Sequence, residues 1–154
     1  MSHRRPHGAA EPMSIVTNST DETRALGARI AGEAQPGDIY ALIGALGTGK
    51  TEFVRGFVAA LDPRAPVRSP SFTLLNIYET PRFPIYHFDF YRLTDPGELT
   101  EIGLNEYLAG EGVCLIEWAD MFLDELPVES LHTIRFEDAG ESRRRIAITG
   151  PAGE

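Results

Sequence analysis

Short apolar segments of two kinds alternate along this chain of 154 residues. Some are compact runs of aliphatic residues, which are typical of buried strands. Others repeat apolar residues at helical spacing. We expect strands at 14–17, 38–43, 113–117, 131–137 and 144–149, and helices after Ser19, over 53–61 and after Asp95. Strands that alternate with helices favour an α/β fold, a layered sheet with flanking helices, over a bundle or a sandwich.

Local signals predict where two of the helices begin. Residues 19–22 have the Ser-x-x-Glu form of a capping box. Asp95 followed by Pro96 predicts the N-cap and the first residue of another helix. The apolar face expected for that single helix comprises Leu99, Ile102, Tyr107 and Leu108.

Two turns are also predicted. Aromatic and β-branched residues are frequent at 67–78 and 83–91, which indicates two extended segments joined by a turn at 79–82. Residues 138–141 have the composition of a hairpin turn between the last two strands.

The length favours one domain. A chain of 16.9 kDa suits a single hydrophobic core, and no apolar run reaches the roughly 18 residues that a membrane span needs. Residues 1–12 carry Arg4 and Arg5 without a following apolar stretch, so they do not resemble a secretory signal. We expect a flexible tail at 1–12 and one folded domain at 13–154.

The charge balance limits the possible partners. Fourteen basic residues stand against 23 acidic ones, which gives a formal net charge of -9. Proteins that grip nucleic acid neutralise phosphates with Lys and Arg, so any contact with nucleic acid should be indirect. The single cysteine, Cys114, lies in an apolar run and is expected to be a small buried residue. These features predict a cytoplasmic protein.

A glycine-rich loop carries the most specific chemistry. Residues 44–51 fit the phosphate-loop pattern G-x-x-x-x-G-K-[ST], between an expected strand and an expected helix. Backbone amides of such a loop cradle phosphates, the lysine reaches the outer phosphates and the Thr hydroxyl can hold magnesium. The predicted nucleotide-binding residues of the loop are Gly44, Ala45, Leu46, Gly47, Thr48, Gly49, Lys50 and Thr51.

Lys50 is the only lysine of the chain, so the other 13 of the 14 basic residues are arginines. An ammonium is a compact point charge on a flexible stem, and an arginine cannot replace it at a crowded site. The position of this one lysine inside the loop is independent support for nucleotide binding.

Two carboxylates are candidates for metal binding or catalysis. Asp89 interrupts an aromatic segment, and Glu117 closes the apolar run 113–117. Acids at the ends of strands near a phosphate loop commonly hold magnesium or its waters. From the pattern alone, Asp89 could instead pair with Arg92, and Glu117 could be a solvated strand end. His87 is expected to be a packed or hydrogen-bonded histidine.

Four segments together resemble the TsaE (YjeE) family, the ATPase component of bacterial tRNA threonylcarbamoyladenosine synthesis. They are the loop 44–51, the Val-Arg-Ser-Pro-Ser-Phe-Thr-Leu stretch at 67–74, the His-Phe-Asp-Phe-Tyr-Arg-Leu stretch at 87–93 and Leu-Ile-Glu-Trp-Ala at 115–119. The similarity extends from about Ser14 to Thr149. The loop departs from the common family form at Ala45 and Thr48, where Asp and Ala are usual.

The resemblance implies roles for individual residues. Lys50 and Thr51 would hold phosphates and magnesium, and Thr73 would lie in a switch-like segment near the γ-phosphate. Asp89 and Glu117 would serve the metal or the attacking water, so that Lys50, Asp89 and Glu117 are the catalytic candidates and Thr51, Asp89 and Glu117 the metal candidates. Trp118 would be a site-edge residue or a plain core tryptophan.

The resemblance also implies where the base binds. The adenine pocket would involve Ser19 and Thr20 together with an arginine near the last strand. Arg143, Arg144 and Arg145 are alternatives at that position, and Arg144 is our candidate.

The function that follows is a slow, magnesium-dependent ATPase. The resemblance implies that the chain works with TsaB and TsaD proteins in tRNA threonylcarbamoyladenosine synthesis and touches tRNA only indirectly. Two alternatives stay open, a small-molecule kinase and a non-catalytic subunit that senses nucleotide. A kinase usually carries an arginine-bearing segment over its acceptor, whereas residues 119–131 contain no Arg or Lys.

Overall fold

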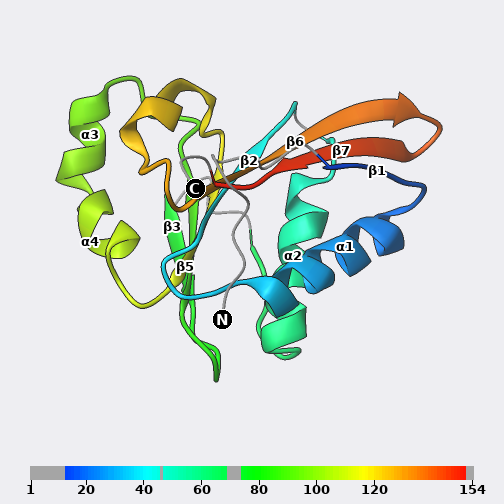
Figure 1. Ribbon diagram of the computed structural model, residues 1–154, viewed down its shortest axis with the longest axis horizontal. Coiled ribbons are helices and arrows are strands. Elements are labelled where there is room, and N and C mark those ends of the chain that lie inside the picture. The colour runs from blue at the N-terminus through cyan, green and yellow to red at the C-terminus, as the bar shows by residue number, and fades with distance from the viewer. Residues whose placement is uncertain (1–12, 46, 69–73, 152–154) are drawn as a thin grey trace.

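A computed structural model describes residues 13–45, 47–68 and 74–151 of the chain. The expected tail at 1–12 lies outside these described residues. The structure is a mixed α/β fold with one sheet and flanking helices, as the sequence pattern predicts (Figure 1). The elements, in chain order, are β1 (Met13–Thr17), α1 (Thr20–Glu33), β2 (Ile39–Ile43), α2 (Lys50–Leu61), β3 (Leu75–Tyr78), β4 (Ile85–Asp89), α3 (Pro96–Glu101), α4 (Leu104–Leu108), β5 (Val113–Glu117), the 3-10 helix η2 (Asp120–Glu125), β6 (Leu131–Gly140) and β7 (Arg143–Thr149).

The seven strands form one sheet in the order β1-β7-β6-β2-β5-β4-β3. The central strands β6, β2, β5 and β4 run parallel to one another, and the outer strands pair antiparallel. Every residue of β2 and of β5 is buried, as expected for strands covered on both faces. The parallel strands bring their carboxyl ends to the same edge of the sheet, and ligands of open α/β sheets bind at such an edge.

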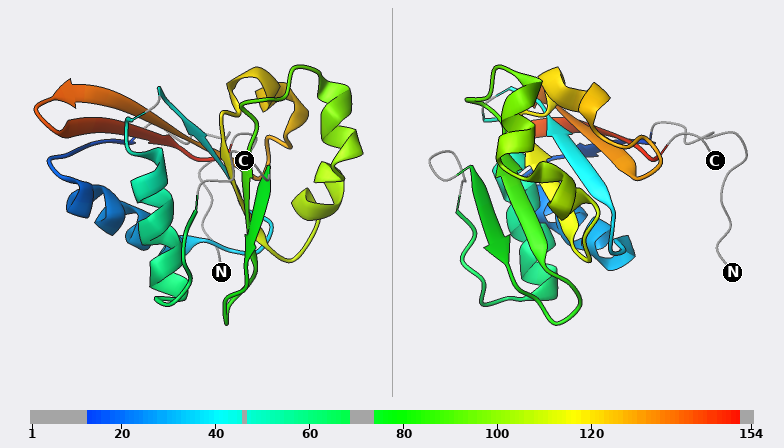
Figure 2. Two further views of the ribbon diagram at one scale, coloured as in Figure 1. Left: turned by 180° about the vertical axis from the view of Figure 1, so that it is seen from behind. Right: turned by 90° about the vertical axis from the view of Figure 1, so that its left-hand side faces the viewer.

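Helices cover both faces of the sheet. In Figures 1 and 2, α1 and α2 lie on one side, and α3, α4 and η2 lie on the other. The core is divided accordingly: residues such as Leu42, Phe53 and Leu115 belong to the α1–α2 side, and residues such as Ala41 and Phe122 belong to the other. The alternation of side chains along each buried strand therefore feeds two separate apolar layers.

Helices α1 and α2 approach each other closely because two glycines lie between them. A Cβ on Gly27 would sit 2.1 Å from the carbonyl oxygen of Phe53, and a Cβ on Gly56 would sit 1.9 Å from that of Arg24. Neither position has room for a side chain. The ion pair between Arg24 Nε and Glu52 Oε1, at 2.7 Å, joins the same two helices.

The helix expected after Asp95 is two helices, so the prediction of a single one is wrong. Asp95 caps α3 with a complete capping box, as the sequence indicates. The chain then turns at Gly103, whose φ of +76° is a left-handed conformation, and α4 begins at Leu104. The sequence pattern also gave no signal for the 3-10 helix η2.

The last turn lies further along the chain than predicted. Strand β6 continues to Gly140, and the turn falls on Glu141 and Ser142, with φ values of +50° and +69°. The turn predicted at 138–141 is therefore placed too early, because Asp138 and Gly140 still pair with β7 across a register shift and only Glu141 belongs to the turn. The extended segments at 67–78 and 83–91 contribute only the short strands β3 and β4, and residues 69–73 lie outside the described part.

The expectations for Ser19 and Cys114 are confirmed. Ser19 caps α1 by accepting from Glu22 N at 3.1 Å, although the Glu22 carboxylate returns to the Asn18 N–H at 2.7 Å and not to Ser19. Cys114 is buried, and burial raises the pKa of its thiol to about 12. Within the described residues, no helix is long and apolar enough to cross a membrane.

The close approach of α1 and α2 generates a stability prediction. Gly27→Ala is expected to lower the free energy of unfolding by about 2 kcal/mol or more, because overpacking a closed contact typically costs 1–3 kcal/mol. Gly32→Ala is the matched control in the same helix, since its Cβ would meet nothing within 4 Å, and it is expected to be neutral or stabilising by about 0.5 kcal/mol. Urea denaturation of both variants makes the comparison; equal stabilities would contradict the prediction.

Candidate functional site

Two glycines of the loop that follows β2 stand where another residue is disfavoured, Gly44 for lack of room and Gly49 for its backbone conformation. A Cβ on Gly44 would lie 2.8 Å from the carbonyl oxygen of Phe136. Gly49 is the N-cap of α2 and has a left-handed φ of +105°. The Thr48 hydroxyl donates to the Ala45 carbonyl at 2.5 Å, which closes the turn between them. Leu46 lies outside the described residues.

Lys50 is the first residue of α2 and is only 4% exposed. Its Nζ donates to the Gly44 carbonyl oxygen at 2.7 Å and stands 3.6 Å from the centroid of the Trp118 ring. Burial lowers the pKa of Lys50 from its usual value, and the charges of Glu117, Asp120 and Asp89 oppose that shift. The ammonium is therefore held beside carboxylates by a carbonyl and an aromatic face.

Asp89 and Glu117 are neighbours at the edge of the sheet. Asp89 ends β4, Glu117 ends β5, and the two residues face each other in the parallel register. Both are buried, with 5% and 4% of their surface exposed. Asp89 accepts from the Tyr91 N–H at 2.9 Å. The reading of Glu117 as a solvated strand end is wrong, because the strand end lies inside the molecule.

His87 is fully buried next to Glu117, which confirms that it is a packed, hydrogen-bonded histidine. Its Nε2 lies 2.7 Å from Oε2 of Glu117, and its Nδ1 lies 3.4 Å from the hydroxyl of Tyr78. His87 does not line the cavity described below, whereas Glu117 does.

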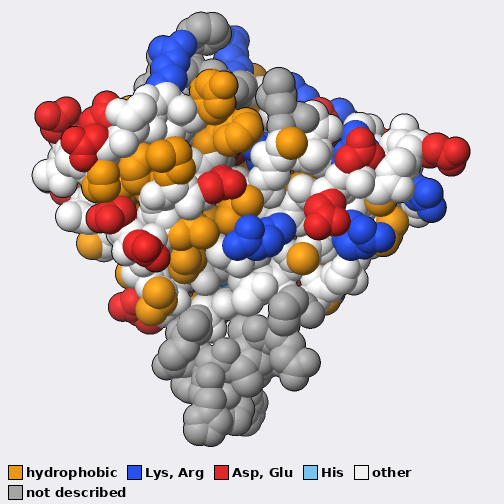
Figure 3. All heavy atoms as spheres, turned by 90° about the horizontal axis from the view of Figure 1, so that it is seen from above, with side chains coloured by type: hydrophobic (Ala, Val, Ile, Leu, Met, Phe, Trp, Pro, Cys, Tyr) orange, Lys and Arg blue, Asp and Glu red, His pale blue; other side chains and the backbone are white. Residues whose placement is uncertain are grey.

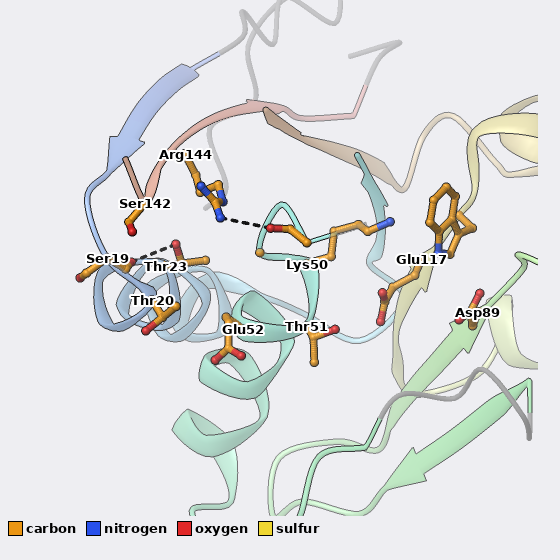
Figure 4. A pocket seen from close by; sticks show the side chains of 13 residues that line it. Ser19, Thr20, Thr23, Lys50, Thr51, Glu52, Asp89, Glu117, Ser142 and Arg144 are labelled. Atoms are coloured by element: carbon orange, nitrogen blue, oxygen red, sulfur yellow. Dashed lines mark hydrogen bonds between the residues drawn. The ribbon is translucent and has the colours of Figure 1, made fainter. Parts of the chain in front are cut away.

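One cavity of about 340 Å³ gathers most of the residues that the sequence singled out. Figure 4 shows Asp89 and Glu117 at one end, Ser19, Thr20, Ser142 and Arg144 at the other, and Lys50 and Thr51 between them. The lining residues are Ser19, Thr20, Thr23, Gly47, Gly49, Lys50, Thr51, Glu52, Asp89, Glu117, Trp118, Ser142 and Arg144. Thr73, predicted near the γ-phosphate, lies outside the described residues.

The structure shows which of the three arginines near the last strand lines the cavity. Arg144 lines the cavity, and its guanidinium donates to the Gly47 carbonyl at 3.1 Å. Arg145 pairs with Glu137 at 3.3 Å, and Arg143 donates to the Gly140 carbonyl; neither lines the cavity. Alternation along β7 explains the difference, because neighbouring side chains of a strand point to opposite faces.

Three lining residues were missed by the sequence analysis. Ser142 lies in the last turn, which the sequence placed too early. Thr23 is one helical turn after Ser19 and shares a hydrogen bond of 2.8 Å with Thr17. Glu52 follows Thr51 directly and is held by Arg24 and Arg55. The position of Thr23 four residues after the N-cap was a usable signal for the same face of α1.

Trp118 occupies the cavity edge in a strained backbone conformation. Its φ is +59°, which is rare for a bulky residue. Its ring contacts Lys50 on one side and lies 5.0 Å from the Tyr91 ring, between centroids. The alternatives for Trp118 were a site-edge residue and a plain core tryptophan, and the structure places it at the edge.

The oxygen ligands around the carboxylate end of the cavity suit a hard cation. Thr51 offers a hydroxyl, and Asp89 and Glu117 offer buried carboxylates; oxygen ligands of this kind are those that magnesium prefers. Within the described residues, no group of three or more His, Cys, Asp or Glu side chains could hold a metal ion. Thr51, Asp89 and Glu117 are the residues of the cavity that could hold such an ion.

Comparison with known proteins gives the family. The model of the family described as "Threonylcarbamoyl adenosine biosynthesis protein TsaE" matches residues 17–146. The tRNA threonylcarbamoyladenosine biosynthesis protein TsaE of Bacillus subtilis is 41% identical over 133 residues, which is 86% of this chain and 82% of that protein. The protein of the same name from Treponema pallidum is 36% identical and is covered over 99% of its length, against 88% of this chain.

A solved structure is similar to this chain in fold as well as in sequence. The crystal structure of Bacillus subtilis YdiB has a TM-score of 0.78 and 35% sequence identity to this chain, covering 92% of this chain and 87% of YdiB. The seven-stranded sheet, the helices on its two faces and the glycine-rich loop at its edge thus belong to a known architecture, and the chain is a member of the TsaE family.

Proposed function

We propose that this protein binds ATP with magnesium and hydrolyses it slowly, as a subunit that supports TsaB and TsaD proteins in tRNA threonylcarbamoyladenosine synthesis. One observation carries the proposal. Gly47 and Gly49 of the loop and the N-terminus of α2 face a buried pair of carboxylates across one cavity. Membership of the TsaE family supports the pathway.

The chain's residues divide the work between binding and hydrolysis. The amides of the loop and the start of α2 present N–H groups and a positive dipole end to phosphate oxygens. Lys50 would exchange its carbonyl and aromatic partners for the outer phosphates, and its charge would stabilise the transition state. Ser19, Thr20, Ser142 and Arg144 would hold the nucleoside at the other end.

Asp89 and Glu117 would serve the reacting end of the nucleotide. Thr51, with one or both carboxylates, would hold magnesium, which when bound neutralises charge on the transferring phosphoryl group. Glu117 would also orient the attacking water, since its carboxylate is buried and fixed beside the cavity. A water that is already held in line with the leaving oxygen loses no further translational or rotational entropy when it attacks.

The surface charge supports an indirect contact with tRNA. Residues 93–134 contain no Lys or Arg, and they include α3, α4 and η2. In Figure 3, acidic and hydrophobic side chains gather on the left of the view, and basic side chains lie towards the centre, right and top. A surface without cations repels a phosphate backbone, so contact with tRNA through partner proteins is the reading that the charges favour. We place this work in the cytoplasm.

Lys50→Ala is expected to abolish ATP hydrolysis and to weaken ATP binding by about tenfold or more, since charge-assisted contacts to phosphate contribute about 1.5–3 kcal/mol. Steady-state hydrolysis and titration with a fluorescent ATP analogue measure the two effects. Circular dichroism shows whether the variant is folded. Wild-type hydrolysis by a folded Lys50→Ala protein would contradict the proposed role.

Arg144→Ala is expected to weaken ATP binding by about 3- to 30-fold, because its guanidinium lies at the cavity and bonds to the loop. Arg145→Ala is the matched control. It removes the same charge from the neighbouring residue, which faces Glu137. The analogue titration compares both variants, and an equal loss of affinity would show that only net charge matters.

Glu117→Gln separates hydrolysis from nucleotide sensing. The amide keeps the shape of the side chain and removes its charge, so ATP is expected to bind while hydrolysis falls about 100-fold or more. In a reconstituted reaction with TsaB, TsaD and tRNA, multiple-turnover modification should fall as well, and Lys50→Ala is the blank. If Glu117→Gln sustains wild-type turnover, ATP binding alone drives the cycle and the sensing subunit is the correct reading.

A further inference from the structure

His87 lies directly behind the cavity wall and has no access to the cavity. It is fully buried and does not line the cavity, whereas its neighbour Glu117 does. His87 therefore does not reach a nucleotide in this cavity, and it would act on the reaction through a neighbouring side chain. The 2.7 Å contact between His87 Nε2 and Glu117 Oε2 provides that route.

The contact is built across neighbouring strands of the sheet. His87 pairs with Leu115 in the register of β4 and β5, and Glu117 is two residues further along β5, so the two side chains are diagonal neighbours on one face. Tyr78 stands in the same diagonal relation on β3, where its register partner on β4 is Ile85. The three side chains thus form a row over three strands, and groups carried by strands are held more precisely than groups carried by loops.

Both ring nitrogens of His87 have a partner. An ionised carboxylate can only accept hydrogen bonds. In a hydrogen bond with such a carboxylate, the Nε2–H group of His87 is therefore the donor. Nδ1 lies 3.4 Å from the Tyr78 hydroxyl, which also donates to the Arg68 carbonyl oxygen at 3.2 Å. Tyr78 is itself anchored, because the Arg68 N–H donates to its oxygen at 3.2 Å. Contacts on both ring nitrogens therefore fix the orientation of the imidazole.

We propose that His87 is a positioning residue that holds Oε2 of Glu117 and so directs the other carboxylate oxygen to the cavity. A glutamate has three rotatable side-chain bonds, and a fixed donor on one oxygen removes that freedom. Hydrogen-bond partners behind metal ligands orient those ligands in this way, and losing one commonly costs 10–100-fold in metal affinity or activity. The inference rests on the proposed ATP hydrolysis and assigns a residue that supports it.

Three variants test this role. His87→Phe removes both hydrogen bonds, His87→Gln keeps one N–H donor, and Phe88→Leu disturbs a fully buried neighbour in the same strand whose side chain belongs to the other apolar layer. For His87→Phe we expect kcat for ATP hydrolysis to fall about 10–100-fold with KM changed less than about threefold. His87→Gln should recover part of the lost kcat. Phe88→Leu should lower the melting temperature and leave kcat within about twofold.

Tyr78→Phe is a further variant that removes only a hydroxyl, so it tests the row even if His87→Phe does not fold. It should lower kcat in the same direction and by less than His87→Phe. A folded His87→Phe protein with wild-type kcat overturns the assignment alone. The assignment is also overturned if Phe88→Leu, at an equal loss of stability, lowers kcat as much as His87→Phe does. If His87→Phe does not fold, a Tyr78→Phe protein with wild-type kcat overturns it. If the wild-type chain hydrolyses no ATP, with or without TsaB and TsaD, the proposed function fails and the assignment fails with it.

Discussion

The parallel pairing of β2, β5 and β4 is the constraint on which the site depends. Adjacent strands lie about 4.8 Å apart, so a register that aligns Asp89 with Glu117 forces two carboxylates together at one edge. The same edge is where β2 ends and the loop 44–51 begins. The charges of both carboxylates favour the ammonium of Lys50 and oppose the lowering of its pKa by burial.

Lys50 is held by partners that it can exchange. A carbonyl dipole and the face of Trp118 stabilise the ammonium less strongly than phosphate oxygens do. The left-handed backbone of Trp118 costs on the order of 1–3 kcal/mol, and such strain persists only where the surroundings impose it. Here the buried strand β5 ends at Glu117 and η2 starts at Asp120, so the chain must turn within two residues, and the turn directs the ring towards Lys50.

The features of the site that depend on neighbouring residues could be predicted from the sequence. The pairing of the strands, which brings those features together, could be seen only in the structure. The loop, the cap at Ser19 and the acids at two strand ends are read from neighbouring residues, so pattern alone predicted them. Ser142 was missed because the position of the last turn depends on how far β6 and β7 remain paired. Likewise, the helix break at Gly103 depends on a left-handed conformation, which a glycine permits and does not require.

The two ends of the cavity are held by different parts of the molecule. Ser19 and Thr20 start α1, Lys50 starts α2, and the contact at Gly27 and Gly56 fixes the distance between these helices. The carboxylates, in contrast, belong to the sheet and are held by its register and by His87. A ligand that fills the cavity must contact both parts at once. Gly27 and Gly56, which do not line the cavity, therefore set the spacing between Ser19 and Lys50, because a side chain at either glycine would push the helices apart.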